Sequence, residues 1–218
     1  MTYTPQTIRL DIARIGTASW DWAGANPGVI RPDLRSRNPT LDQTATTGLT
    51  NAALQEELAE YCWTCYSKTL ASKGHMVIGR VSDLTAAGLH EKVADIGAGQ
   101  YLFDHGTQGN LLRMDKWARV VNDAWLLGGV HRRATFRLAS RITMGNLWNS
   151  NGGYFVVTAR EIAGLLHFGY QYKRVGPWQV LTSENQGKAA NANLVEYDNY
   201  INRIQSHNTA RTLLVMLG

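Results

Sequence analysis

The chain is poor in cysteine and has no long apolar stretch. Only two of its 218 residues are cysteines, Cys62 and Cys65, which excludes the disulfide framework of small secreted domains. No apolar run approaches the roughly 20 residues that span a bilayer, and the first ten residues lack the pattern of a secretory signal. We therefore expect a cytoplasmic protein without a membrane segment; secretion without a cleaved signal would leave the same pattern.

The sequence also lacks the short signatures of common enzyme classes. It contains no Gly-x-Ser-x-Gly elbow, no phosphate-binding loop and no HExxH motif. Cys62 and Cys65 form a CxxC pair, but no second CxxC or HxxxH completes a zinc site. Three turns of expected helix precede Cys62, so the free helix amides that activate redox cysteines are not available to it. Core packing explains the pair best, and the sequence predicts neither a metal nor a cofactor.

Helical and strand patterns alternate along the chain, which predicts the fold class. Leu54, Leu58, Tyr61 and Cys65 recur at helical spacing, and Gly74 follows as a stop signal. Thr158 and Glu161 have the spacing of a capping box at a helix start. The prediction is a single α+β domain with a mixed sheet flanked by helices. Strands are expected at 7–12, 75–81, 100–104, 133–142 and 212–217, a hairpin at 170–182, and helices at 51–74, 82–97, 110–128, 158–167 and 194–204.

Residues 16–50 show neither pattern. Pro27, Pro32 and Pro39 lie here among glycines and small polar residues, so we expect a long irregular segment. Such a segment inside a compact domain is unusual. It is expected to be functional in itself or to form an arm that wraps on the domain and contacts a protein partner.

The positive charge is concentrated in one part of the chain. Residues 113–141 hold seven Lys or Arg and two Asp, and so carry the whole net charge of +5. On the expected strand, Arg133, Arg137 and Arg141 project from one face. The cations of the preceding helix follow every third residue, and both sets are candidates to bind a phosphate-bearing substrate; an ordinary solvated sheet face is the alternative. The helix cations are Arg113, Lys116 and Arg119.

Two histidines are candidate catalytic groups. His131 adjoins the arginines, whose charge disfavours its cationic form, so it could act as a general base. His105 lies in a glycine-bordered turn. With Arg133 to stabilise developing negative charge, they would suffice to cleave RNA. The expected function is a small basic enzyme acting on RNA or a nucleotide, similar in size and charge to toxin or effector domains. The competing expectation is a non-catalytic nucleic-acid-binding or assembly protein.

A third possibility comes from the segment "VADIGAGQY" (93–101). Asp95, Gly97 and Gly99 follow an acid-x-Gly-x-Gly pattern, and Asp115 lies 20 residues beyond Asp95. This pattern resembles the first motif of Rossmann-like methyltransferases. The resemblance implies binding of S-adenosylmethionine, with glycines approaching the ligand and an acid accepting ribose hydroxyls. It covers only a short part of the chain, and a helix that stops at Gly97 accounts for the same residues.

Overall fold

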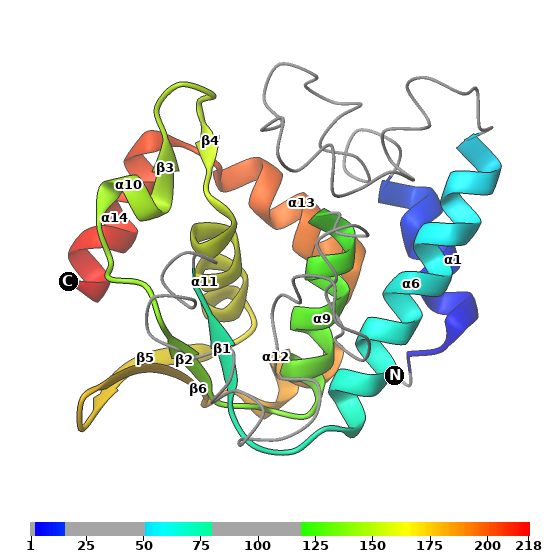
Figure 1. The fold of residues 1–218 in the computed structure, drawn as a ribbon, viewed down its shortest axis with the longest axis horizontal. Coiled ribbons are helices and arrows are strands. Elements are labelled where there is room, and N and C mark those ends of the chain that lie inside the picture. The colour runs from blue at the N-terminus through cyan, green and yellow to red at the C-terminus, as the bar shows by residue number, and fades with distance from the viewer. Residues whose placement is uncertain (1–2, 16–50, 80–118) are drawn as a thin grey trace.

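The structure is a computed structural model that describes residues 3–15, 51–79 and 119–218. Eight helices and six strands lie within these ranges (Figure 1). The helices are α1 (Pro5–Ile15), α6 (Asn51–Ala71), α9 (Arg119–His131), α10 (Met144–Leu147), α11 (Val157–His167), α12 (Gln186–Asn191), α13 (Leu194–Ile204) and α14 (His207–Leu217). The strands are β1 (Met76–Ile78), β2 (Phe136–Leu138), β3 (Trp148–Asn149), β4 (Tyr154–Phe155), β5 (Tyr170–Val175) and β6 (Trp178–Ser183).

The main sheet is mixed, with the order β1-β2-β6-β5. The β1–β2 pair is parallel, whereas β2–β6 and β6–β5 are antiparallel. Strands β3 and β4 form a separate hairpin. Together with the helices, this arrangement confirms the predicted α+β class.

The β5–β6 hairpin shows how the sequence sets the sheet register. Val175 pairs with Trp178, so only Gly176 and Pro177 form the loop. Gly176 has a positive φ of 57°, which glycine adopts without the steric cost that other residues incur. A two-residue loop that starts with such a glycine matches the twist of antiparallel strands. The hairpin predicted at 170–182 is thus confirmed.

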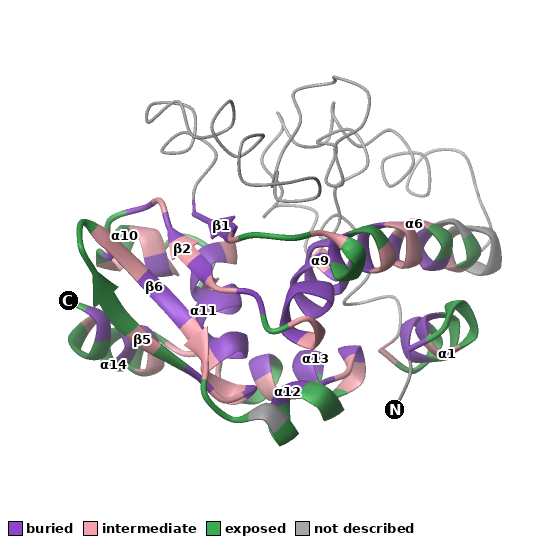
Figure 2. Ribbon diagram, turned by 90° about the horizontal axis from the view of Figure 1, so that it is seen from below, coloured by how far each residue is buried: buried purple, intermediate pink, exposed green. Residues whose placement is uncertain are grey.

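Helices α9 and α11 lie at the centre of the described fold. Residues 120–130 of α9 are all buried, and α6 packs along this helix (Figure 2). The two helices can approach closely because Gly128 has no Cβ. A Cβ at this position would lie 2.6 Å from the Tyr66 carbonyl oxygen. The Cys62 and Cys65 side chains are completely buried on α6 and are not joined by a disulfide, which confirms their core role. The predicted helix end at Gly128 is wrong, since α9 continues to His131.

Two expected strands are helices. Residues 7–12 lie within α1, where Ile8 and Ile12 are buried one turn apart and Leu10 is exposed. Residues 212–217 lie within α14, where Leu213 and Leu217 are buried while Val215 is 84% exposed. In both segments the spacing of buried residues is four, which places them on one face of a helix.

Several other elements were predicted with the correct type, and some of them differ in extent. Helix 51–74 is confirmed as α6, although it ends at Ala71. The strands expected at 75–81 and 133–142 are shortened to β1 and β2. Helix 194–204 is confirmed as α13. The irregular segment 16–50, helix 82–97 and strand 100–104 lie outside the described residues.

Candidate functional site

Cationic residues gather where the two parallel strands begin. The Met76 amide donates to the Thr135 carbonyl at 2.8 Å, so the residues that precede β1 lie beside those that precede β2. His75 directly precedes β1, whereas Arg132 and Arg133 connect α9 to β2, which carries Arg137. We call His75, Arg132, Arg133 and Arg137 the strand-entry cluster.

Arg132 has two buried donors without a partner. Its Nη1 donates to the Gly74 carbonyl oxygen at 2.9 Å. Its Nε and Nη2 are shielded from solvent and have no hydrogen-bond acceptor. Burial without a compensating carboxylate lowers the pKa of Arg132. Nε and Nη2 form the side of a guanidinium that grips two oxygens of a carboxylate or phosphate with parallel N–H bonds.

His75 lies within the electrostatic field of two of these arginines. Burial lowers the pKa of His75, and the charges of Arg137 and Arg132 lower it further. An ordinary histidine has a pKa near 6.5, so His75 is neutral at pH 7 and can accept a proton. Arg137 extends over the ring of Trp178, with 4.8 Å between its Cζ and the ring centroid. The cluster therefore combines cations, one neutral imidazole and an aromatic surface.

Among the described residues, no carboxylate pairs with the cluster. Burial raises the pKa of the Tyr170 phenol, and the charges of Arg132 and Arg133 offset part of this increase. The carbonyl end of α9 supplies partial negative charge to these residues, but it leaves the Arg132 Nε and Nη2 unbonded. Within the described ranges, no member of the cluster belongs to an ion pair. The pairs found there are Arg9–Glu56, Arg160–Asp123, Arg160–Asp198, His167–Glu196 and Lys173–Glu184.

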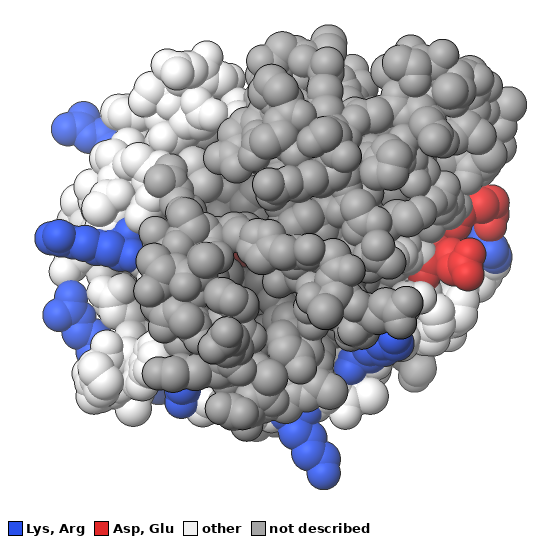
Figure 3. Space-filling view, viewed as in Figure 1, with Lys and Arg blue, Asp and Glu red and all other residues white. Residues whose placement is uncertain are grey.

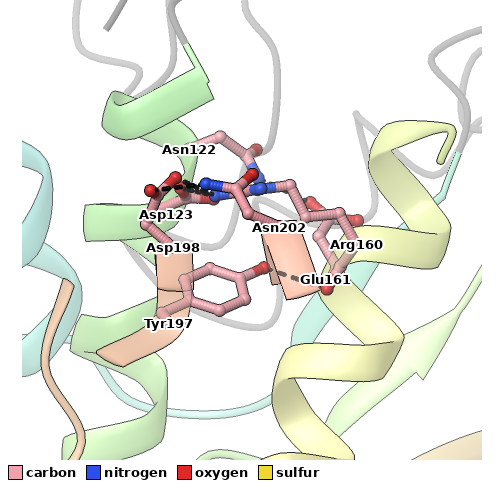
Figure 4. A network of polar contacts seen from close by, with 7 residues as sticks. All are labelled: Asn122, Asp123, Arg160, Glu161, Tyr197, Asp198 and Asn202. Atoms are coloured by element: carbon pink, nitrogen blue, oxygen red, sulfur yellow. Dashed lines mark hydrogen bonds and ion pairs between the residues drawn. The ribbon is translucent and has the colours of Figure 1, made fainter. Parts of the chain in front are cut away.

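A second polar assembly is buried between α9, α11 and α13 (Figure 4). Arg160 donates from Nε to Asp123 Oδ1 at 3.0 Å and from Nη2 to Asp123 Oδ2 at 2.5 Å. Its Nη2 also lies 3.4 Å from Asp198 Oδ1. The Tyr197 hydroxyl donates to the Arg160 carbonyl oxygen at 3.0 Å. Here the same side of a guanidinium is filled by a carboxylate, so this network ties three helices together.

Glu161 lies beside this network and has a raised pKa. Its Oε1 accepts a hydrogen bond of 3.0 Å from Asn122 Nδ2. Burial, opposed by this bond, raises the pKa of Glu161 to about 8. The capping-box prediction is therefore wrong: Val156 precedes the first turn of α11 without a side-chain cap, and both Thr158 and Glu161 are buried.

His131 does not join the strand-entry cluster through its ring. Its Nε2 lies 2.9 Å from the Ala192 carbonyl oxygen, which can only accept, so Nε2 carries the proton. Its Nδ1 then accepts from the Tyr66 hydroxyl at 2.7 Å. Burial, rather than the neighbouring arginines, is the main cause that lowers the pKa of His131. Both ring nitrogens are thus engaged in contacts that join α9 to α6 and to the end of α12.

The arginines of the predicted cationic face are only partly brought together. Arg137 projects from β2 between the buried Phe136 and Leu138, as the alternation predicts. Arg133 and Arg141 fall outside the strand, and Arg133 has a positive φ of 58°. Arg119 is half-buried at the start of α9. His105, Arg113, Lys116 and the motif at 93–101 lie outside the described residues.

Sequence reasoning missed His75, Arg132 and Trp178 as site residues. Arg132 belongs to the basic segment, but nothing in its neighbours along the chain distinguishes it from Arg133. The proximity of His75 to Arg137 depends on the pairing of β1 with β2, two strands about 60 positions apart, which local patterns do not reveal. A histidine directly before a buried strand was the one available signal.

In the view of Figure 3, most of the visible Asp and Glu atoms lie at the right-hand rim, next to a Lys or Arg side chain. The other visible Lys and Arg side chains lie along the left and lower rims. The ranges that the structure describes contain no group of three or more His, Cys, Asp or Glu that could hold a metal ion. None of the helices in those ranges is long and apolar enough to cross a membrane. No protein-family model, curated protein or solved structure matches the chain.

Proposed function

We propose that the protein is an enzyme that acts on a phosphate-bearing substrate, RNA or a nucleotide, and binds the phosphate at the strand-entry cluster. The observation that carries this proposal is the pair of buried, unpartnered N–H groups of Arg132. Leaving such donors unbonded is costly, and a phosphate oxygen pair satisfies both. Arg133 and Arg137 add positive charge, and no carboxylate of the described residues pairs with them.

The roles within the site follow from charge. His75 is the proposed general base, because its neutral form is favoured and the arginines oppose its protonation. Arg132 and Arg137 stabilise the negative charge that develops on the phosphoryl oxygens. We assign the base to His75 rather than to His131, whose ring nitrogens are both hydrogen-bonded. This chemistry requires no metal.

The direct test is turnover of RNA and a panel of nucleotides in EDTA. We expect wild-type protein to convert at least one substrate and His75→Gln to be slower by about 10²- to 10⁴-fold, the usual contribution of a general base. His207→Gln, at the exposed start of α14, is the matched control and should keep full activity. If no substrate is converted by wild-type protein, the enzymatic proposal fails; equal rates for the first variant and wild type would refute only the role of His75.

A binding role without catalysis is the second candidate. The Arg137–Trp178 pair favours it, because a cation beside an aromatic ring can contact both the phosphate and the base of a single-stranded nucleic acid. It predicts RNA binding that Trp178→Ala weakens, with no change in the RNA itself. Cys62 and Cys65 are not joined by a disulfide, which supports a reducing compartment, and we propose a cytoplasmic location for either function.

A further inference from the structure

We infer that the strand-entry cluster recognises a terminal phosphate, the monoester group at the end of a nucleotide or RNA chain, in preference to an internal phosphodiester. The inference rests on the proposed function and names the part of the substrate that the cluster binds. Two independent features of the site support it, one of shape and one of charge.

The shape argument concerns the Arg132 guanidinium. Nη1 is held by the Gly74 carbonyl oxygen, so the orientation of the group is fixed and its Nε–Nη2 side faces inward. These two nitrogens are shielded from solvent, although the residue as a whole is half-buried. A group that ends in a phosphate can reach such a recessed pair with two free oxygens. An internal phosphodiester continues in both directions and needs an open channel past the guanidinium.

The charge argument concerns the balance of the whole cluster. Arg132, Arg133 and Arg137 carry three positive charges, and none of them is ion-paired within the described chain. His75 is held neutral and contributes no further charge. A diester supplies one negative charge, whereas a phosphate monoester supplies about 1.5 to 2 near pH 7. The monoester therefore compensates more of the cluster, and the partly desolvated setting strengthens that difference.

Arg160 provides an internal comparison. Its Nε and Nη2 grip both oxygens of Asp123, and Asp198 lies close to the same guanidinium. Two carboxylates thus accompany one buried arginine in that network. Arg132 presents the same two nitrogens, and no carboxylate in the described part of the chain bonds to them. By this comparison, we expect the ligand that binds to Arg132 to carry close to two negative charges.

The test compares three related probes by isothermal titration of the full chain at fixed ionic strength. They are a nucleoside monophosphate, its cyclic diester and the nucleoside itself. We expect the monophosphate to bind at least tenfold more tightly than the cyclic diester, and the nucleoside to bind weakest. Arg132→Lys keeps the charge but removes the paired donors, and should abolish most of the preference. Arg211→Gln, an exposed arginine on α14, should leave it unchanged.

The outcomes separate the inference from the function on which it rests. Equal affinity of wild-type protein for monophosphate and cyclic diester overturns the inference, while turnover of a diester substrate would leave the proposed function standing. If wild-type protein binds neither probe and converts no substrate, both fail. The wild-type preference is decisive by itself, so the conclusion does not depend on whether Arg132→Lys folds.

Discussion

At the scale of residues, the described chain contains two arginines whose surroundings differ in one respect. Arg160 is buried with a carboxylate on its paired nitrogens, and Arg132 has the same nitrogens buried without one. Buried ion pairs contribute little net stability, but removing one partner is strongly destabilising. This difference is the basis for the structural role of Arg160 and for the binding role that we propose for Arg132.

Glu161 gives a prediction about pH. The pKa of Glu161 is about 8 in the folded protein, against the ordinary glutamate value of 4.5. At a pH between these two values, the folded state keeps a proton on Glu161 that the unfolded chain has lost. Stability should therefore fall as pH rises from about 4.5 to 8. Glu161→Gln cannot ionise and can still accept from Asn122. We expect it to unfold at higher urea concentration than wild type at pH 8, by on the order of a few kcal/mol, and to match it near pH 4.5.

The control for this prediction is Glu60→Gln, which removes the same charge from an exposed position on α6. Its stability should follow the wild-type pH dependence. Parallel curves for Glu161→Gln and wild type would show that the Glu161 carboxyl is ionised in the folded state.

The sequence located the basic segment but not the arrangement of its members. Arg133, Arg137 and Arg141 were expected on one face of a strand, but only Arg137 lies on β2. His75 could not be identified, because its proximity to Arg137 arises from the pairing of β1 with β2. The engagement of His131 by Tyr66 and Ala192 depends on residues 61 to 65 positions away, which also lies beyond local patterns.

At the scale of elements, the segments with a single clear period were predicted correctly. Helix α13 and the β5–β6 hairpin are examples, each bounded by a strong turn or cap signal. Helix α1 was mistaken for a strand because Ile8 and Ile12 fit both alternation and a four-residue repeat. Helix α14 was mistaken for a central strand because residues 212–217 are apolar on both faces of an extended chain. In short apolar segments, tertiary packing decides between the two, and the sequence does not display it.

The packing of α6 on α9 supplies an element-scale prediction. A methyl group at Gly128 would meet the Tyr66 carbonyl oxygen and the Leu70 amide nitrogen, both of which belong to the backbone of α6. Since backbone cannot rotate away, the helices must separate, and Gly128→Ala should lower stability by about 1–3 kcal/mol. Gly145→Ala is the control, because nothing lies within 4 Å of the added methyl group. Thermal unfolding of the two variants tests this; equal melting temperatures would mean that α6 and α9 are not in close contact.

At the scale of the whole molecule, the chain has a net charge of +5. Within the described ranges, the arginines of the strand-entry cluster form no ion pair with a carboxylate. A net positive charge attracts an anionic polymer and makes its association sensitive to salt.

Binding to single-stranded RNA should therefore weaken with salt in a defined way. If Arg132, Arg133 and Arg137 each contact one phosphate, the logarithm of the affinity should fall against the logarithm of salt concentration with a slope of about −2. Arg137→Gln should reduce the magnitude of that slope, whereas Arg9→Gln, which removes a charge paired with Glu56, should not. Fluorescence anisotropy at several salt concentrations measures it. A slope that responds equally to both substitutions would indicate diffuse attraction to the whole surface.

The buried cysteines of α6 can report when the contact between α6 and α9 opens. Burial raises the pKa of both thiols, that of Cys65 to about 12, so neither is reactive in the closed molecule. A chromogenic thiol reagent can modify them only in molecules whose α6–α9 contact has come apart. The rate of colour development therefore measures how often these cysteines become exposed to solvent, and no label has to be introduced.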